Sequence, residues 1–144
     1  MCLTTFDKQK RIADKDIMVY KCLQFTFKSK SIGQMDYSIY SPYYNKEWLF
    51  NTIYTDKIKK PTGYKTEVEK GLHSATTIRR AKNHGGHIFT AIIPKGTAYY
   101  KGNNNDLVSE ALVIKYDLPC WRYGKKFENV HELMLNSHKV KYRL

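Results

Sequence analysis

Hydroxyl, imidazole and guanidinium side chains follow one another closely between residues 73 and 80 and could together bind an anion. The hydroxyls precede a predicted short helix, whose free amides and dipole favour a negative charge. The arginines lie on its first turn, where a planar guanidinium group can donate two hydrogen bonds to one phosphate. An ordinary capped helix with a solvated face is the alternative interpretation. The candidate ligand-binding residues of this segment are His73, Ser74, Thr76, Thr77, Arg79 and Arg80.

Aromatic residues are dense between residues 36 and 54, where a planar ligand could stack. Tyr43, Tyr44 and Trp48 are the candidates for this contact. Aromatic rings also bury large apolar areas and often serve simply as core, which is the alternative here. Pro42 disfavours a long helix in this stretch, so we expect extended or turn backbone around it.

One acidic residue could take part in catalysis. Glu110 begins the last predicted strand, within the apolar segment Val108–Ile114. A carboxylate among apolar residues requires a partner or a chemical role. A position on the solvent side of the strand would satisfy it equally well, so both interpretations stay open.

The histidines and cysteines do not predict a metal site. The histidines are His73, His84, His87, His131 and His138. His84 and His87 bracket a pair of glycines, but no third ligand follows at a zinc-binding spacing. Cys2, Cys22 and Cys120 form no metal motif, and their odd number argues against a disulfide framework. We therefore expect no metal, no required cofactor and a reducing, cytoplasmic setting.

The charge of the chain predicts an anionic partner. There are 25 Lys and Arg residues against 13 Asp and Glu, which gives a net charge of +12. This excess attracts nucleic acid, a phosphorylated small molecule or an acidic protein surface, although lysines also serve simply for solubility. Basic and aromatic residues alternate in three segments, which could follow a nucleic-acid backbone while stacking bases. These segments are Tyr64–Lys65, Tyr99–Lys101 and Trp121–Lys126, and none contains a recognised reader motif.

The residues from 71 to 116 predict a strand, helix, strand, turn, strand series. The helix is expected over 76–84, with Ser74, Thr76 or Thr77 as its cap and Gly85 at its end. The strands that follow are expected at 87–93, 98–101 and 107–116, with a turn at 102–106.

The flanking segments predict further elements. Residues 17–27 favour one long strand or two short ones that meet near Lys21, followed by a turn at 28–33. A weak edge strand is expected at 64–68. Pro119 is expected to end the last strand, and a helix to follow at 128–136. Residues 137–144 are expected to pair as a short strand or to stay loose.

Together these patterns predict an α+β fold, a single compact domain over residues 1–144. It is expected to be mainly antiparallel sheet with one short central helix and a C-terminal helix, and residues 1–14 to form a flexible arm. Met1 to Lys15 has no apolar core of the kind a cleavable signal requires. No apolar run approaches the roughly 20 residues that span a bilayer, so no membrane partner is expected.

The segment Gly71–Ser74, which reads Gly-Leu-His-Ser, precedes the predicted helix and a Pro-Lys-Gly-Thr turn at 94–97. This arrangement resembles small uncharacterised domains of phages and mobile elements that carry a Gly-Phe-His-Ala or Gly-Phe-His-Ser signature. The resemblance implies a viral or prophage setting, in the cytoplasm of an infected or lysogenic bacterial host.

The same order of elements is similar, more loosely, to the ADP-ribosyltransferase core. That family has an early Arg or His, a Ser-Thr-Ser strand and a Glu-x-Glu before its last strand. The resemblance aligns Tyr20–Lys21 with the basic residue, His73–Ser74 with the serine strand and Glu110 with the final glutamate. It would make Glu110 the catalytic carboxylate and NAD the cofactor. Here lysine replaces arginine, the Ser-Thr-Ser motif is absent and Val108 occupies the first acidic position, which favours a relative that only binds.

Three functions are therefore expected. The leading one is a phage-type accessory protein that binds an anionic, nucleotide-like ligand and sequesters a host nucleotide signal without catalysis. The alternative is an ADP-ribosyltransferase-like enzyme that uses NAD. The third is a virion or nucleic-acid-associated structural protein, for which a homo-oligomer would be expected.

Overall fold

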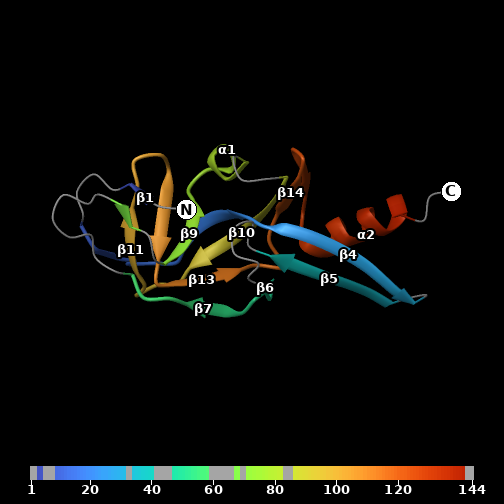
Figure 1. The fold of residues 1–144 in the computed structure, drawn as a ribbon, viewed down its shortest axis with the longest axis horizontal. Helices are drawn as coiled ribbons and strands as arrows, with labels where there is room; N and C mark the ends of the chain where they lie inside the picture. Colours follow the sequence, from blue (N-terminus) through green and yellow to red (C-terminus); the bar gives the residue numbers. More distant parts are fainter. Residues whose placement is uncertain are drawn as a thin grey trace.

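Antiparallel strands make up most of the fold (Figure 1). The structure, a computed structural model, describes residues 3–4, 9–31, 34–40, 47–58, 67–68, 71–82 and 86–141. Its strands are β1 (Leu3–Thr4), β2 (Arg11–Ile12), β3 (Ile17–Cys22), β4 (Gln24–Ser31), β5 (Gln34–Tyr40), β6 (Glu47–Trp48), β7 (Ile53–Thr55), β8 (Glu67–Val68), β9 (Leu72–Ala75), β10 (His87–Ile93), β11 (Ala98–Lys101), β12 (Asp106–Ser109), β13 (Ala111–Ile114), β14 (Cys120–Arg122) and β15 (Lys125–Phe127). Its helices are α1 (Ile78–Ala81) and α2 (Val130–Lys141). The expected antiparallel sheet and two helices are confirmed, but the fold is richer in strands than the α+β class implies.

Strand β10 is the centre of the largest sheet. This sheet runs in the order β15-β14-β10-β3-β9-β12-β11-β2, and β13 pairs with both β10 and β7. β3 pairs along one side of β10, while β14 and β13 share its other side. Both faces of β10 are largely covered, which accounts for its near-continuous apolar sequence.

The large sheet curls back on itself, because a short stretch of chain joins its end to its middle. β2, at one end of the strand order, is connected to β3 by residues 13–16 alone. Ile12 of β2 pairs with Ala98 of β11, and Ile17 of β3 pairs with Ile93 of β10. The two pairs have the same register, so the pairing continues in step on both sides of residues 13–16. Residues 11–12 therefore belong to the sheet, and residues 3–4 pair with β8, where a flexible arm was expected.

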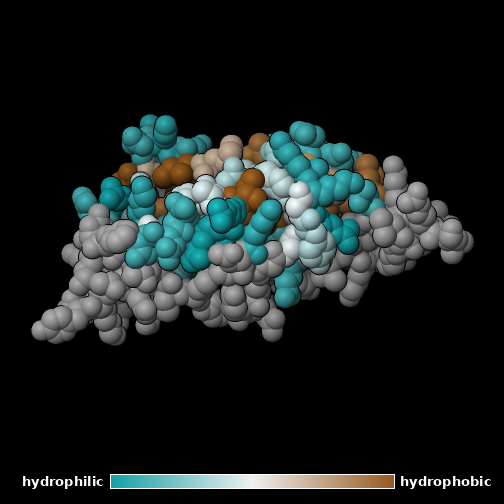
Figure 2. Space-filling view, turned by 90° about the horizontal axis from the view of Figure 1, so that it is seen from above, coloured by the Kyte–Doolittle hydropathy of each residue, from teal (hydrophilic) through white to brown (hydrophobic). Residues whose placement is uncertain are grey.

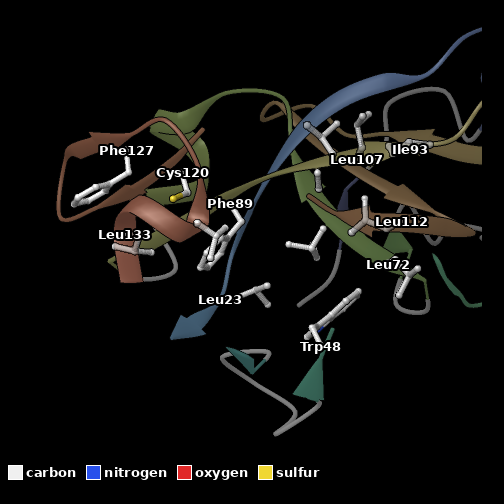
Figure 3. Packing of buried hydrophobic residues seen from close by; sticks show 14 of the residues in the cluster. Leu23, Trp48, Leu72, Phe89, Ile93, Leu107, Leu112, Cys120, Phe127 and Leu133 are labelled. Carbon is white, nitrogen blue, oxygen red and sulfur yellow. The ribbon is translucent and has the colours of Figure 1, made fainter. Parts of the chain in front are cut away.

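The main core lies on one face of this sheet (Figure 3). Alternate residues of the strands point into it, and α2 and the segment around β6 and β7 cover it. Phe89, Leu112 and Ile114 of the sheet and Leu133 of α2 are fully buried. Burial of each such side chain contributes about 1.5–3 kcal/mol, so these residues supply much of the driving force for folding.

A hairpin of β4 and β5 extends from the large sheet. β4 follows β3 after Leu23, and β5 pairs with β4 and with β6. Helix α2 lies beside this hairpin in Figure 1 and contacts β4, β14 and β15. Within the described residues, neither helix is both long and apolar enough to cross a bilayer.

Several predicted elements are confirmed. The strands expected at 87–93 and 98–101 are β10 and β11. The segment 17–27 forms two strands that meet at Leu23, which was one of the two arrangements expected. Thr77 is the cap of α1, which is shorter than the helix predicted over 76–84. Gly85, its expected end, lies outside the described residues.

Other predicted elements were wrong. The strand expected at 107–116 is divided at Glu110 into β12 and β13, because the two halves pair with different neighbours. Residues 28–31 belong to β4, where the beginning of a turn at 28–33 was expected. Pro119 does not end the sheet, because β14 and β15 follow it. Residues 137–141 continue α2, where a strand or a loose end was expected.

Candidate functional site

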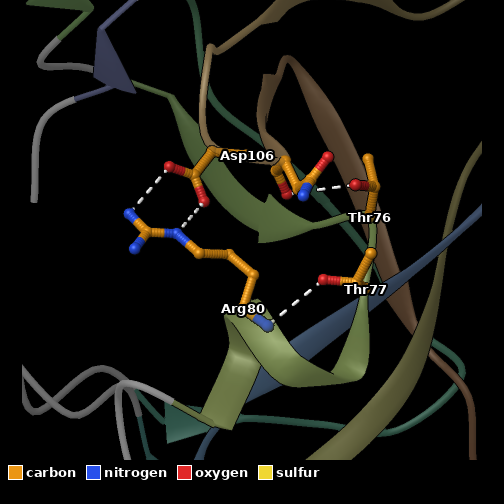
Figure 4. Close-up of polar contacts among 5 residues, drawn as sticks. Thr76, Thr77, Arg80 and Asp106 are labelled. Carbon is orange, nitrogen blue, oxygen red and sulfur yellow. Dashed lines mark hydrogen bonds and ion pairs between the residues drawn. The ribbon is translucent and has the colours of Figure 1, made fainter.

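Arg80, a predicted phosphate ligand, forms a bidentate ion pair with Asp106 at the start of β12 (Figure 4). Its Nε donates to Asp106 Oδ1 at 2.7 Å and its Nη2 donates to Oδ2 at 2.9 Å. The hydrogen bonds to the Asp106 carboxylate raise the pKa of Arg80. The donor pair that would grip a phosphate is therefore occupied within the protein.

The neighbouring hydroxyls also have partners inside the protein (Figure 4). Thr77 Oγ1 accepts a hydrogen bond from Arg80 N at 3.2 Å and so caps α1. Thr76 Oγ1 donates to Asn105 O at 3.2 Å, which ties this turn to the loop before β12. These contacts favour the capped-helix interpretation of the segment. Arg79 is exposed and makes no ion pair within the described part of the chain.

Strands β3 and β9 bring a second group of polar side chains together. Lys21 Nζ donates a hydrogen bond to His73 O at 2.6 Å. The register that pairs Tyr20 with Ala75 sets Lys21 opposite Ser74, and directly opposed residues share a face of the sheet. Lys21 was a functional candidate only through its alignment with the transferase core. No local signal links it to His73, because 52 residues separate the two.

Ser74 carries a buried hydroxyl group whose hydrogen-bonding capacity is unused. The residue is 8% exposed, and its Oγ has no hydrogen-bond partner among the described residues. An unsatisfied buried hydroxyl costs about 1–3 kcal/mol, so such a group calls for an explanation. A bound ligand that supplied the missing partner would provide one.

Trp48 is part of the core, next to Lys21. It is 3% exposed and packs edge-on against Tyr54, with 4.6 Å between the ring centroids. Lys21 Nζ lies 5.2 Å from the centroid of the Trp48 ring, within the range of a cation–π interaction. The indole therefore forms a wall beside the ammonium group and is not an exposed stacking surface. Tyr43 and Tyr44, the other predicted stacking residues, lie outside the described residues.

Glu110 occupies the break between β12 and β13 and is tied to the structure around it. Its Oε1 accepts a hydrogen bond from Ile58 N at 3.5 Å and lies 3.6 Å from Lys10 Nζ. Its backbone N donates to Ala98 O at 2.9 Å. The carboxylate thus has the partners that a partly buried charge requires.

Two of the three segments aligned with the transferase core lie on neighbouring strands, and the third directly follows the next strand of the sheet. Tyr20–Lys21 is in β3 and His73–Ser74 is in β9, and β12, which ends just before Glu110, pairs with β9 on its other side. Val108 lies directly opposite His73.

The described histidines and cysteines do not form a metal centre. Within the described part of the chain, no group of three or more His, Cys, Asp or Glu side chains could hold a metal ion. Burial raises the pKa of the Cys120 thiol to about 12, with a smaller contribution from Glu132. Burial likewise raises the pKa of Cys22. Both thiols are therefore protonated and poor nucleophiles at neutral pH.

Comparisons with protein-family models, curated proteins and solved structures found no match to the chain.

Proposed function

We propose that the protein binds an anionic, nucleotide-like ligand at the junction of β3 and β9, without catalysing a reaction on it. The observation that carries the proposal is the unused hydroxyl of Ser74, at the position of β9 that the register sets opposite Lys21 of β3. An ammonium group attracts phosphate, and a hydroxyl can donate to it or to a sugar oxygen. Trp48 beside Lys21 provides an apolar wall.

This site differs from the one that the sequence favoured. Thr76, Thr77 and Arg80 have partners within the protein, so their part in binding would be to hold β9 and α1 in place. His73 and Ser74 remain as ligand candidates from the original set. In the phage setting that the Gly71–Ser74 motif implies, the protein would sequester a host nucleotide signal in the cytoplasm.

A titration with nucleotides and cyclic dinucleotides tests the proposal. We expect heat on mixing and a rise in Tm with at least one of them, because a ligand that binds only the folded state stabilises it. Lys21→Met should abolish both signals. Lys82→Met, which removes an exposed lysine from the end of α1, is the matched control and should bind normally.

Ser74→Ala separates ligand binding from a structural role. Removal of an unsatisfied buried hydroxyl should leave the ligand-free protein as stable as before, or slightly more stable. The same change should weaken ligand binding, because the ligand loses its partner. Unchanged affinity in Ser74→Ala and Lys21→Met, or no response to any nucleotide, would contradict the proposal.

A second candidate is an ADP-ribosyltransferase-like enzyme that uses NAD. The adjacency of β3, β9 and β12 supports it, because two of the aligned segments lie side by side on β3 and β9 and Glu110 directly follows β12. Incubation with labelled NAD should modify a target, and Glu110→Gln should abolish the transfer. Glu128→Gln, at an exposed position before α2, is the control. Equal transfer by Glu110→Gln and the unaltered protein would exclude this candidate.

A further inference from the structure

Strands β14 and β15 form a hairpin with an unusual turn. Tyr123 and Gly124 connect the strands, and Arg122 pairs with Lys125 across them. Both turn residues have positive φ, 48° for Tyr123 and 86° for Gly124, as in a type I′ turn. Such turns favour Asn-Gly. A bulky aromatic residue in this conformation is an outlier and is more strained than asparagine would be.

Burial does not explain why a tyrosine occupies this turn. Tyr123 is 77% exposed, the most exposed of the large hydrophobic residues whose side chains are described. Strained residues of this kind often have a functional role.

The exposed ring is nevertheless held in place. Tyr123 N donates a hydrogen bond to Gly86 O at 2.8 Å. A Cβ atom on Gly86 would collide with the Tyr123 ring, so the glycine makes room for it. The His87 ring lies 5.6 Å from the Tyr123 ring, centroid to centroid. Burial and the nearby Arg122 charge lower the pKa of His87 to about 4, so this neighbour is uncharged at neutral pH.

Basic residues lie next to Tyr123 on both strands of the hairpin. Arg122 Cζ lies 5.9 Å from the Tyr123 ring centroid. Lys125 and Lys126 are exposed on β15, and neither forms an ion pair within the described residues. The carboxylate of Glu132 at the start of α2 accepts a hydrogen bond from Glu128 N at 2.8 Å. We refer to residues 122–126 as the hairpin tip.

Helix α1 extends the basic surface beside the hairpin. Its buried side packs with Trp121 and Tyr20. These two rings meet edge to face, with 5.5 Å between their centroids. Arg79 and Lys82 are exposed on the same short segment. α1 and β14 lie along the same edge of Figure 1. The view onto that edge shows a largely hydrophilic surface with small hydrophobic patches between (Figure 2).

We propose that the hairpin tip binds single-stranded nucleic acid, with Tyr123 stacking on a base and Arg122, Lys125 and Lys126 contacting the flanking phosphates. A single strand fits because its bases are free to stack on a side chain, whereas duplex bases are already stacked. The cations supply the non-specific attraction to the backbone. This surface is separate from the nucleotide site proposed at Lys21 and Ser74, and either could exist without the other.

Fluorescence anisotropy with labelled oligothymidylate of about 12 nucleotides tests the stacking contact. Tyr123→Asn should weaken binding roughly 5- to 150-fold, which is the range for loss of one stacked base. The same change should not lower Tm, because asparagine suits the turn better than tyrosine. Tyr123→Phe keeps the ring and should bind as the unaltered protein does.

The charge contacts are tested by the dependence of affinity on salt. The double variant Lys125→Gln/Lys126→Gln should reduce the slope of log affinity against log salt by about 1.4, or about 0.7 for each phosphate contact. Lys15→Gln/Lys95→Gln removes two exposed lysines elsewhere and should leave the slope nearly unchanged. Lys21→Met should still bind the oligonucleotide, so failure of the nucleotide proposal can be distinguished from failure of this one.

Three results would overturn the proposal. The first is no binding to the oligonucleotide at low salt. The second is equal affinity of Tyr123→Asn and the unaltered protein. The third is tighter binding to a duplex of the same length, unaffected by changes at Tyr123, which would indicate a general attraction to the phosphate backbone.

Discussion

Arg80 and Asp106 show how one side-chain pair fastens two distant parts of the chain. The guanidinium and carboxylate groups meet in a bidentate pair and are 27% and 18% exposed. The pair joins the short helix α1 to the first residue of β12. A helix of one turn has little stability of its own, so it depends on contacts of this kind.

Replacement of Arg80 with alanine should therefore destabilise the protein. We expect the free energy of unfolding to fall by about 1–3 kcal/mol, because the Asp106 carboxylate loses its partner in a partly buried place. Arg79→Ala removes the same charge from the neighbouring exposed position and should cost no more than about 0.5 kcal/mol. Urea denaturation of both variants measures the difference. Equal losses would show that the ion pair contributes nothing specific.

His87 should make stability depend on pH. Its folded-state pKa is lowered to about 4 by burial and by Arg122, from an ordinary value of 6.5. Between these two values the unfolded chain binds more protons, so stability should fall as the pH drops from about 6.5 towards about 4. His87→Gln should show a smaller fall over this range, while His131→Gln, at an exposed position of α2, should behave as the unaltered protein does. Urea denaturation across this pH range provides the measurement, and identical pH profiles for all three proteins would contradict the assignment.

At the scale of elements, the buried side chains described for α2 lie on the face that packs against the sheet. Val130, Leu133 and Met134 are buried against the core, whereas Leu135 is 40% exposed. The helix covers Phe127 and Cys120 of the β14–β15 hairpin, so its docking also supports the hairpin tip.

Two leucines of α2 allow a matched test of this arrangement. Leu133→Ala should lower the free energy of unfolding by roughly 2–5 kcal/mol, because it leaves a cavity in the core. Leu135→Ala makes the same chemical change at an exposed position and should cost about 1 kcal/mol or less. Chemical denaturation followed by circular dichroism checks both. A similar cost at the two positions would mean that α2 does not dock on the sheet as described.

At the scale of the whole molecule, the net charge of +12 opposes compactness. This charge is what remains after every acidic group is counted, so ion pairs such as Lys10–Glu110 and Lys115–Asp117 do not reduce it. Like charges on one surface repel, and salt screens that repulsion over about 10 Å at 0.1 M ionic strength.

Moderate salt should therefore raise the thermal stability of the ligand-free protein. We expect Tm to increase by a few degrees between low and physiological NaCl, since repulsion among the surplus cations outweighs the loss from screened ion pairs. Differential scanning calorimetry checks this, and the Lys125→Gln/Lys126→Gln variant should show a smaller increase. A fall in Tm with added salt would mean that attractive pairs dominate the surface.

Local patterns in the sequence were sufficient for much of the framework. The apolar run of β10, the strand β11 and the turn between residues 101 and 106 were predicted because neighbouring residues encode them. The apolar face of α2 was likewise visible in its spacing, although its end was not. The short strands β14 and β15 were missed, since a strand of three residues carries little periodic signal.

The site depended on contacts between residues that are far apart in the chain. The sequence showed hydroxyls and arginines suited to an anion. Only the fold showed that Arg80 pairs with Asp106, that Trp48 is buried in the core, and that the strand of Lys21 pairs with the strand of Ser74. The sequence determined which chemical groups were present and which backbone segments they preferred. Tertiary structure decided which of those groups remain available, because a partner 26 or 52 residues away leaves no trace in local spacing.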